Sequence, residues 1–412
     1  MIIRFGFTDR DSELIREDRS KDPLGLQPVW GYFGRQLIPN LTEQTKHASG
    51  FWILACILYL YEQEYSKWAN DKSDRKTIPV EDFYILAEQL FAYSSYHHQK
   101  KWRLPGSNEL KYHYEQRKNG VVIIGHNREL VGSQIAGGTW GLYRGAARRS
   151  KILDDSERLS ALFLSEFKRD QLPLTPKRAK DLFAIIQAAQ EFRYEGWGFN
   201  VTDKLSEQLS QTMEHMGSNA EVIYKYLIGQ GTLLDKVVRD YKNNTQSDRA
   251  FLSNCRQKYS EQAYIFEDII KCEDYIGTLD STLQFLYAYA GKPLKTACND
   301  LPLSTTKIRQ AYDQFMRVSK RPSGETAAER YDTITSLFEV DTKENFARWL
   351  LRLHAKIAEG REGTPWIELD DADRIRVNIE YDAATELTVT PGNGWKNKYY
   401  MDSLLSVFKG LR

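Results

Sequence analysis

Apolar residues at helical spacing, opened by capping residues and closed by turn residues, recur along most of this chain. The capping residue Thr42 opens a first predicted helix that runs to about Asn70. Thr77 opens a second, which continues through FYILAEQLFAYSSY. The further predicted helices are Thr139–Ser150, Ser156–Phe167, Thr175–Phe192, Asp203–His215, Ala220–Ile228, Asp248–Ala290 in two pieces, Thr305–Val318, Thr326–Leu337, Glu344–Glu359 and a last one over YYMDSLLSVFKGL.

Three stretches depart from this pattern. The residues up to about Leu41 contain too many glycines and prolines for a long regular element. Val121–Ile124 is a short apolar run between two glycines and is predicted to be a buried strand. Near the C-terminus, Arg374–Tyr381 and Thr385–Thr390 alternate in polarity and predict a hairpin.

These elements predict a mainly α fold: a multi-helix body with a short internal strand region and a small C-terminal β-hairpin element. We expect three consecutive domains. Residues 1–195 form an N-terminal helical domain, residues 196–362 a second helical domain, and residues 363–412 the hairpin with its final helix. A chain of 412 residues is long enough for this number of domains.

The composition indicates a soluble cytoplasmic protein. The apolar fraction of 41% and the charged fraction of 27% are those of a folded globular chain rather than a disordered one. The longest apolar run, Phe51–Tyr61, is about half the length of a membrane span and predicts a buried helix. The N-terminal residues turn polar too early for a secretory signal. The four cysteines have no C-x-x-C pair and no zinc-like spacing, and free thiols suit a reducing compartment.

Charge is concentrated in one segment. The net charge of the whole chain is +1, but Tyr96–Lys151 contains eleven Lys or Arg against three Glu and is net +8. Four of the seven histidines and several aromatic residues lie in it. Clustered cations neutralise phosphates, and aromatic rings can stack on bases. The segment therefore predicts a local nucleic-acid surface.

The residues expected to act there fall into two groups. Arg144 and Arg148 lie four apart on one face of the helix predicted at Thr139–Ser150, with Arg149 beside them. The glycines before that helix leave its first N–H groups open to an anion. The cations expected to hold phosphate are Lys100, Lys101, Arg103, Arg144, Arg148 and Arg149. The rings expected to pack beside them or stack on bases are Trp102, Trp140 and Tyr143.

No motif names a reaction, so the catalytic residues and any cofactor stay unknown. His98-Gln99-Lys100 and His354-Ala355-Lys356 match the H-x-K of phospholipase-D-type nucleases, but neither is followed by the Asp that this family needs. The adjacent His97 and His98 have poor geometry for a shared metal, and we predict no metal site. The acidic pairs are expected to cap helices and turns. No phosphate-binding loop, dinucleotide fingerprint or nucleophile elbow is present.

Two stretches resemble an uncharacterised family of bacterial proteins. One is Asp22-Pro-Leu-Gly-Leu with Leu37-Ile-Pro-Asn-Leu-Thr-Glu-Gln-Thr and the helix around Trp52; the other is GVVIIGHNRELVGSQIAGGTWGL. The resemblance covers about the first 150 residues. It departs from the family pattern at Gly132-Ser133 and at Ser49-Gly50. Members often accompany antiviral defence and DNA-modification genes, and the resemblance implies the same setting here without implying an activity.

We therefore expect a nucleic-acid-binding component, with DNA ahead of RNA, of a bacterial antiviral defence or DNA-processing system. Other subunits of such a system are further expected partners, and a membrane is not. Two alternatives stay open. One is a nuclease or nucleobase-acting hydrolase whose site is assembled from dispersed residues. The other is a protein-interaction scaffold subunit of a defence complex.

Overall fold

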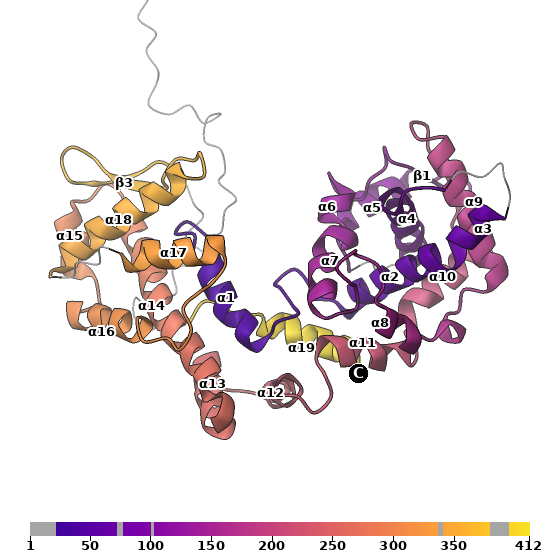
Figure 1. Cartoon of the computed structure of the whole chain (residues 1–412). Coiled ribbons are helices and arrows are strands. Elements are labelled where there is room, and N and C mark those ends of the chain that lie inside the picture. Colours follow the sequence, from indigo (N-terminus) through magenta and orange to yellow (C-terminus); the bar gives the residue numbers. More distant parts are fainter. Residues whose placement is uncertain (1–21, 72–76, 100–102, 337–340, 380–394) are drawn as a thin grey trace, which may run out of the picture. The chain divides into compact units, whose positions relative to one another are not determined.

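The chain groups into two compact units. The computed structural model describes residues 22–71, 77–99, 103–336, 341–379 and 395–412. Unit 1 combines Met1–Leu37 with Asn244–Tyr399, and unit 2 combines Ile38–Asn243 with Tyr400–Arg412. Their elements are labelled in Figure 1. In the described ranges the architecture is mainly α with two short antiparallel two-stranded sheets, which confirms the predicted fold class.

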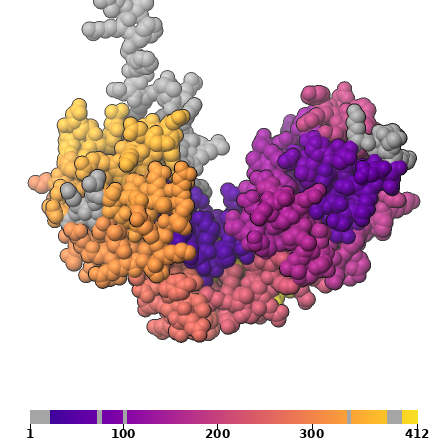
Figure 2. Space-filling model, in the orientation of Figure 1, coloured from indigo at the N-terminus to yellow at the C-terminus, as the bar shows by residue number. Residues whose placement is uncertain are grey.

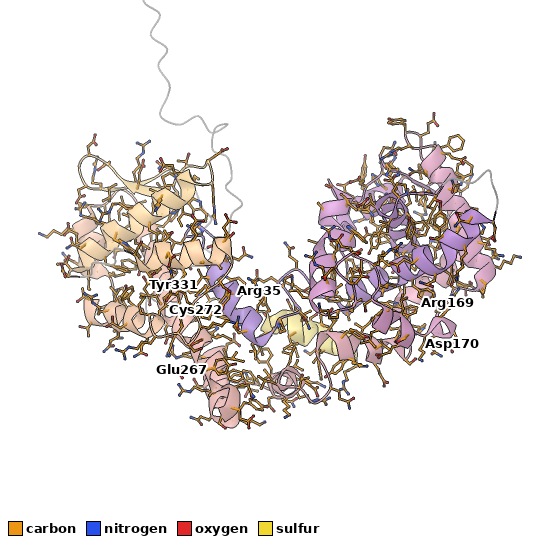
Figure 3. The ribbon with its side chains drawn as sticks, viewed as in Figure 1. Arg35, Arg169, Asp170, Glu267, Cys272 and Tyr331 are labelled. Carbon is orange, nitrogen blue, oxygen red and sulfur yellow. The ribbon has the colours of Figure 1, made fainter. Side chains whose placement is uncertain are left out.

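Unit 1 is built around the long helix α14. Residues on every side of α14 are buried, as expected of a helix at the centre of a core, and α1, α13, α16 and α18 pack against it. Cys272, labelled in Figure 3, is one of its buried residues. The elements of unit 1 are α1 (Gln27–Leu37), α13 (Asp248–Lys258), η3 (Ser260–Gln262), α14 (Ala263–Tyr287), α15 (Leu294–Asp300), α16 (Thr305–Phe315), α17 (Glu325–Thr335), α18 (Lys343–Glu359), β3 (Ile367–Leu369) and β4 (Ile375–Val377).

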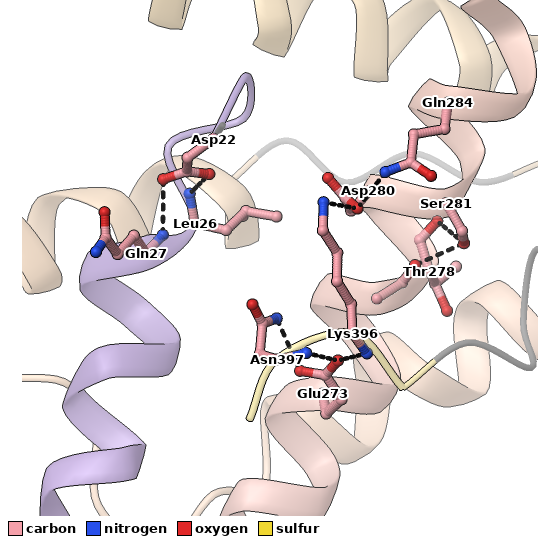
Figure 4. Close-up of polar contacts among 11 residues, drawn as sticks. Asp22, Leu26, Gln27, Glu273, Thr278, Asp280, Ser281, Gln284, Lys396 and Asn397 are labelled. Carbon is pink, nitrogen blue, oxygen red and sulfur yellow. Dashed lines mark hydrogen bonds and ion pairs between the residues drawn. The ribbon is translucent and has the colours of Figure 1, made fainter. Parts of the chain in front are cut away.

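Helix α1 lies where the sequence predicted an irregular segment, so that prediction is wrong for these residues. Both oxygens of the Asp22 carboxylate accept backbone N–H groups, from Leu26 at 2.7 Å and Gln27 at 2.8 Å, which caps the helix start (Figure 4). Pro28 lies in the first turn, where a missing N–H costs no hydrogen bond. The apolar residues of α1, including Phe33 and Leu37, are buried. Burial and the cap outweigh the low helix propensity of the glycines.

A buried carboxylate ties residues 395–399 to α14. Glu273 accepts the backbone N–H groups of Lys396 (2.6 Å) and Asn397 (2.9 Å), the Asn397 side-chain amide (2.9 Å) and the Tyr399 hydroxyl (2.8 Å). Figure 4 shows the contacts with Lys396 and Asn397, and that of the Lys396 ammonium with Asp280. Four donors compensate the desolvation of this carboxylate, although burial still raises its pKa. Glu273 thus attaches the last residues of unit 1 to the helix at its centre.

A hairpin forms near the C-terminus from β3 and β4, and one of its two strands was predicted. Strand β4 lies inside the predicted strand Arg374–Tyr381, and it pairs with β3 before it through the register Leu369↔Ile375. The second predicted strand, Thr385–Thr390, lies outside the described residues. The connecting turn is held by Asp370, whose carboxylate accepts the N–H groups of Ala372 and Arg374.

Unit 2 surrounds α4, which contacts α2, α9 and α10 (Figure 1). Its elements are α2 (Ala48–Tyr59), the π-helical turn η1 (Leu60–Tyr65), α3 (Ser66–Asn70), α4 (Val80–Gln99), α5 (Ser107–Glu115), β1 (Val121–Ile124), α6 (Gln134–Gly137), α7 (Thr139–Arg149), α8 (Ala161–Glu166), η2 (Arg169–Gln171), α9 (Pro176–Glu191), β2 (Trp197–Asn200), α10 (Lys204–Glu214), α11 (Asn219–Leu227), α12 (Leu233–Lys242) and α19 (Met401–Gly410).

The longest apolar run is a buried helix, as predicted. Every side chain from Phe51 to Leu58 in α2 is at most 1% exposed, and the Trp52 indole donates to the Thr212 carbonyl at 2.6 Å. No helix in the described ranges combines the length and apolar character needed to cross a membrane. The strand predicted at Val121–Ile124 is present as β1, and its antiparallel partner is β2, with Val122 opposite Phe199. Its predicted burial holds for Val122 and Ile124 only, because side chains alternate between faces and Ile123 is 41% exposed.

The two units divide the chain differently from the three predicted domains. Each unit contains one long internal piece and one piece from a chain end. Figure 2 shows violet and magenta-pink parts of the chain side by side on the surface of unit 2. The consecutive boundaries at residues 195 and 362 stay a prediction.

Gly50 sets how closely α2 and α7 approach. A Cβ atom at this position would lie 2.2 Å from Cζ of Tyr143, a ring that is itself fully buried. We expect Gly50→Ala to lower the free energy of unfolding by about 1–3 kcal/mol, because the ring has no room to move. Urea unfolding followed by far-ultraviolet circular dichroism measures this change.

The matched control is Gly145→Ala in α7. Its Cβ would come no closer than 3.5 Å to the mobile end of Arg149, so we expect a gain of about 0.5–1 kcal/mol from helix propensity. Equal stability of the Gly50→Ala variant and the parent would contradict the packing of Tyr143 on α2.

Candidate nucleic-acid interface

Of the three arginines predicted on α7, Arg148 and Arg149 lie in its last turn, and Arg144 lies one turn before them. Arg144 and Arg148 both reach the carboxylate of Glu157, at 2.9 Å and 3.7 Å, and their side chains are 40% and 50% exposed. Arg149 is exposed and donates from Nε to the Pro39 carbonyl at 2.9 Å. The shared face of Arg144 and Arg148 is confirmed, and its carboxylate partner was not predicted.

Arg103, another of the cations expected to hold phosphate, lies in the loop before α5. The Arg103 side chain is exposed, and its positive charge lies close enough to His47 to affect the pKa of that imidazole. Burial, Arg103 and Lys46, in that order, lower the pKa of His47. The His47 backbone N–H meets the Tyr143 hydroxyl of α7 at 3.3 Å. Lys100, Lys101 and Trp102 lie outside the described residues.

The aromatic residues of α7 pack in the core. Trp140 is 3% exposed and lies against Tyr84, with ring centroids 5.1 Å apart; Tyr143 is 1% exposed and meets Phe51 edge-to-face at 4.9 Å. Burial raises the pKa of Tyr143 to about 12. Trp140 and Tyr143 therefore pack in the core, and the expected stacking on bases is wrong for both because no face of either ring is open.

The start of α7 is already occupied by an acidic side chain of the protein itself. The Glu88 carboxylate accepts the backbone N–H of Thr139 at 2.8 Å and its hydroxyl at 2.5 Å, and the Gln134 side-chain amide at 2.7 Å. Glu88 is 1% exposed, and burial raises its pKa despite these donors. A phosphate at this helix start, which the preceding glycines suggested, is therefore excluded by the α4 carboxylate that occupies it.

The same network fixes the turn after β1. Gln89, next to Glu88 on α4, exchanges two hydrogen bonds with the backbone of Gly125, at 2.9 Å and 3.0 Å. Gln134 accepts the N–H of Leu130 at 3.1 Å. Each of these side chains is buried and bonded. The network thus joins α4, β1 and the start of α7 into one rigid group.

Three of the segment's histidines are bonded to neighbouring side chains. Between α4 and α5, Tyr93 contacts Nδ1 of His113 at 3.2 Å and His97 contacts the Tyr114 hydroxyl at 2.6 Å. Partial burial lowers the pKa of both histidines. His126 lies elsewhere, with Nε2 donating to Gln190 at 2.6 Å. No group of metal ligands occurs among the described residues.

The two H-x-K matches differ in their surroundings. His354 is buried in α18, where its Nδ1 donates to the Pro23 carbonyl at 3.0 Å and its Nε2 accepts from the Trp366 backbone at 2.8 Å. Both ring nitrogens thus hold the fold of unit 1. His98 is exposed near the end of α4, and Lys100 lies outside the described residues.

The acidic pairs follow the expected structural roles in part. Asp154 accepts two backbone N–H groups of its own turn, as Asp370 does in the hairpin. Asp268 instead accepts the N–H of Ser319 at 2.9 Å, joining α14 to the loop after α16. Arg169, labelled in Figure 3, forms an ion pair with Glu64 between η2 and η1.

Exposed rings were missed because they lie after the basic segment in sequence. Phe192, Tyr194 and Trp197 are 43%, 86% and 37% exposed. The pairing of β2, which begins at Trp197, with β1 brings this stretch next to the basic segment. A strand of four residues containing a glycine, WGFN, gives little signal on its own.

The chain matches no family model, no curated protein and no solved structure. The resemblance to the bacterial family stays a prediction.

Removal of the Glu88 carboxylate tests the network. Glu88→Ala leaves three buried donors without an acceptor, each costing about 1–3 kcal/mol, so we expect a loss of at least ~3 kcal/mol in the free energy of unfolding. Glu329→Ala, at an exposed position of α17, removes the same charge and is expected to change stability by less than about 0.5 kcal/mol.

The effect of Glu88 has a defined pH dependence. Because the pKa is raised in the folded protein, the stability that Glu88 contributes is complete below its unfolded pKa of 4.5 and is lost as the pH rises through the folded value. The stability difference between the parent and Glu88→Ala is therefore expected to be largest near pH 4 and to shrink toward neutral pH. A difference that grows over this range would contradict the direction of the shift.

Proposed function

We propose that unit 2 binds nucleic acid, with DNA ahead of RNA, through the phosphates of the backbone. The observation that carries the proposal is the group of Arg144, Arg148 and Arg149 in one stretch of α7, exposed at the surface of a segment that is net +8. Guanidinium groups present paired donors that match phosphate oxygens. Arg103 extends the same chemistry to the loop before α5.

The carboxylate of Glu157 leaves this group able to bind phosphate. It is shared by two arginines, so it neutralises only one of their two charges. An exposed ion pair is worth at most about 1 kcal/mol, because water competes for both partners. A DNA phosphate can therefore replace Glu157 at little cost. Meanwhile the contact keeps Arg144 and Arg148 extended on the same face before binding.

Contacts of this kind recognise the backbone rather than the base sequence. The proposed activity is thus sequence-independent binding within a bacterial antiviral defence or DNA-processing system, the setting that the resemblance of the first 150 residues supports. Other subunits of such a system are the proposed protein partners. They would supply any sequence recognition.

Alanine at all three α7 arginines tests the proposal. Each lost phosphate contact lowers the slope of log affinity against log salt by about 0.9, so we expect Arg144→Ala/Arg148→Ala/Arg149→Ala to reduce the slope for duplex DNA by up to ~2.7. Fluorescence anisotropy with a labelled duplex at several salt concentrations measures it.

The control removes the same charge from unit 1. Lys307→Ala/Arg309→Ala/Lys320→Ala changes three exposed cations on and after α16, and we expect its slope to equal that of the parent. If both triple variants lost affinity equally, binding would follow net charge alone, and the α7 surface would be ruled out.

A further inference from the structure

Three exposed rings, Phe192, Tyr194 and Trp197, lie just before and at the start of β2. Phe192 and Trp197 are stacked, with ring centroids 5.3 Å apart and planes at 26°. Tyr194, between them in sequence, is 86% exposed. Ile123 of β1 is 41% exposed opposite Gly198, on the other face of the two-stranded sheet from Trp197, which pairs with Ile124. Exposed aromatic groups of this kind mark binding surfaces more often than chance positions.

The surface has a rigid base. Gly196 has φ +78°, and a Cβ there would lie 2.5 Å from Cγ2 of Ile123 and 2.7 Å from the Ile124 carbonyl oxygen. Its N–H bonds to the Phe192 carbonyl at 2.8 Å, and Asn127 donates to the Tyr194 carbonyl. Because β1 is joined to α4 through Gln89, the rings are positioned before any ligand arrives.

Cations lie at the opposite end of the ribbon. Arg117 and Lys118 are exposed just before β1, with the Arg117 guanidinium 4.0 Å from the centre of the Tyr114 ring. Four residues of strand separate them from the rings, a span of ~13 Å. Nearer the rings, Arg193 lies 3.8 Å from Asp82, and Glu191 and Glu195 are exposed. The ribbon thus presents aromatic faces at one end and positive charge at the other.

We propose that Phe192, Tyr194 and Trp197 form a base-stacking surface for single-stranded DNA, whose backbone runs along the ribbon toward Arg117 and Lys118. This inference rests on the proposed nucleic-acid binding and adds a preference for single strands. Bases in a duplex have their faces covered by their neighbours, whereas an unpaired base can lie on an exposed ring. The positive charge of Arg117 and Lys118 along the same ribbon favours a polyanion over an apolar protein partner.

The test uses the full chain with labelled oligo(dT) and a labelled duplex. Stacking on an aromatic ring changes affinity by about tenfold to a hundredfold per base. We expect Tyr194→Ala/Trp197→Ala to bind oligo(dT) at least tenfold more weakly and the duplex within twofold of the parent. Tyr194→Phe keeps the ring and is expected to bind like the parent. Tyr264→Ala removes a 51% exposed ring from unit 1 and serves as the control.

The outcomes separate the two proposals. If the parent binds both ligands and Tyr194→Ala/Trp197→Ala binds oligo(dT) equally well, stacking is overturned while backbone binding stands. If the parent binds neither ligand at low salt, both proposals fail. If the rings instead serve a second copy of the chain, light scattering of the parent shows a larger species that the double variant lacks, with oligo(dT) affinity unchanged; this result also overturns stacking. Thermal melting of each variant confirms that it is folded.

Discussion

The buried carboxylate of Glu88 is the interaction on which the arrangement of unit 2 depends. A carboxylate removed from water is costly unless its oxygens are fully bonded, and here the start of α7 and the side chain of Gln134 supply the donors. These bonds hold the start of α7 against α4. Gln89, the next residue, fixes the turn after β1 in the same way. Helix α4 therefore positions both surfaces that we propose for nucleic acid.

The filled helix start also decides where phosphate can bind. Since Glu88 accepts the first N–H of α7, that of Thr139, we place phosphate binding on the side chains at the other end of the helix. Arg148 and Arg149 are favoured there by the negative end of the helix dipole. They are thus compatible with a stable helix and remain exposed for a ligand. The same cations serve the fold and the proposed function.

The local pattern predicted most helices, the buried run in α2 and the strand β1, because each depends on residues close in sequence. It missed α1, whose cap is the side chain of Asp22, and it missed β3, the strand that pairs with β4. In the site it identified the shared face of Arg144 and Arg148. It did not identify Glu88, which lies 51 residues from Thr139 and resembles any acid on a helix. Nor did it separate the buried rings of Trp140 and Tyr143 from the exposed rings near β2, because exposure is set by tertiary packing.

The most direct measurement is the affinity of the unmodified chain for a labelled oligonucleotide as the salt concentration is raised. Phosphate contacts release counterions, so the account predicts tight binding at low salt and a linear fall of log affinity with log salt. Absence of binding at low salt, or an affinity that does not change with salt, would contradict the account.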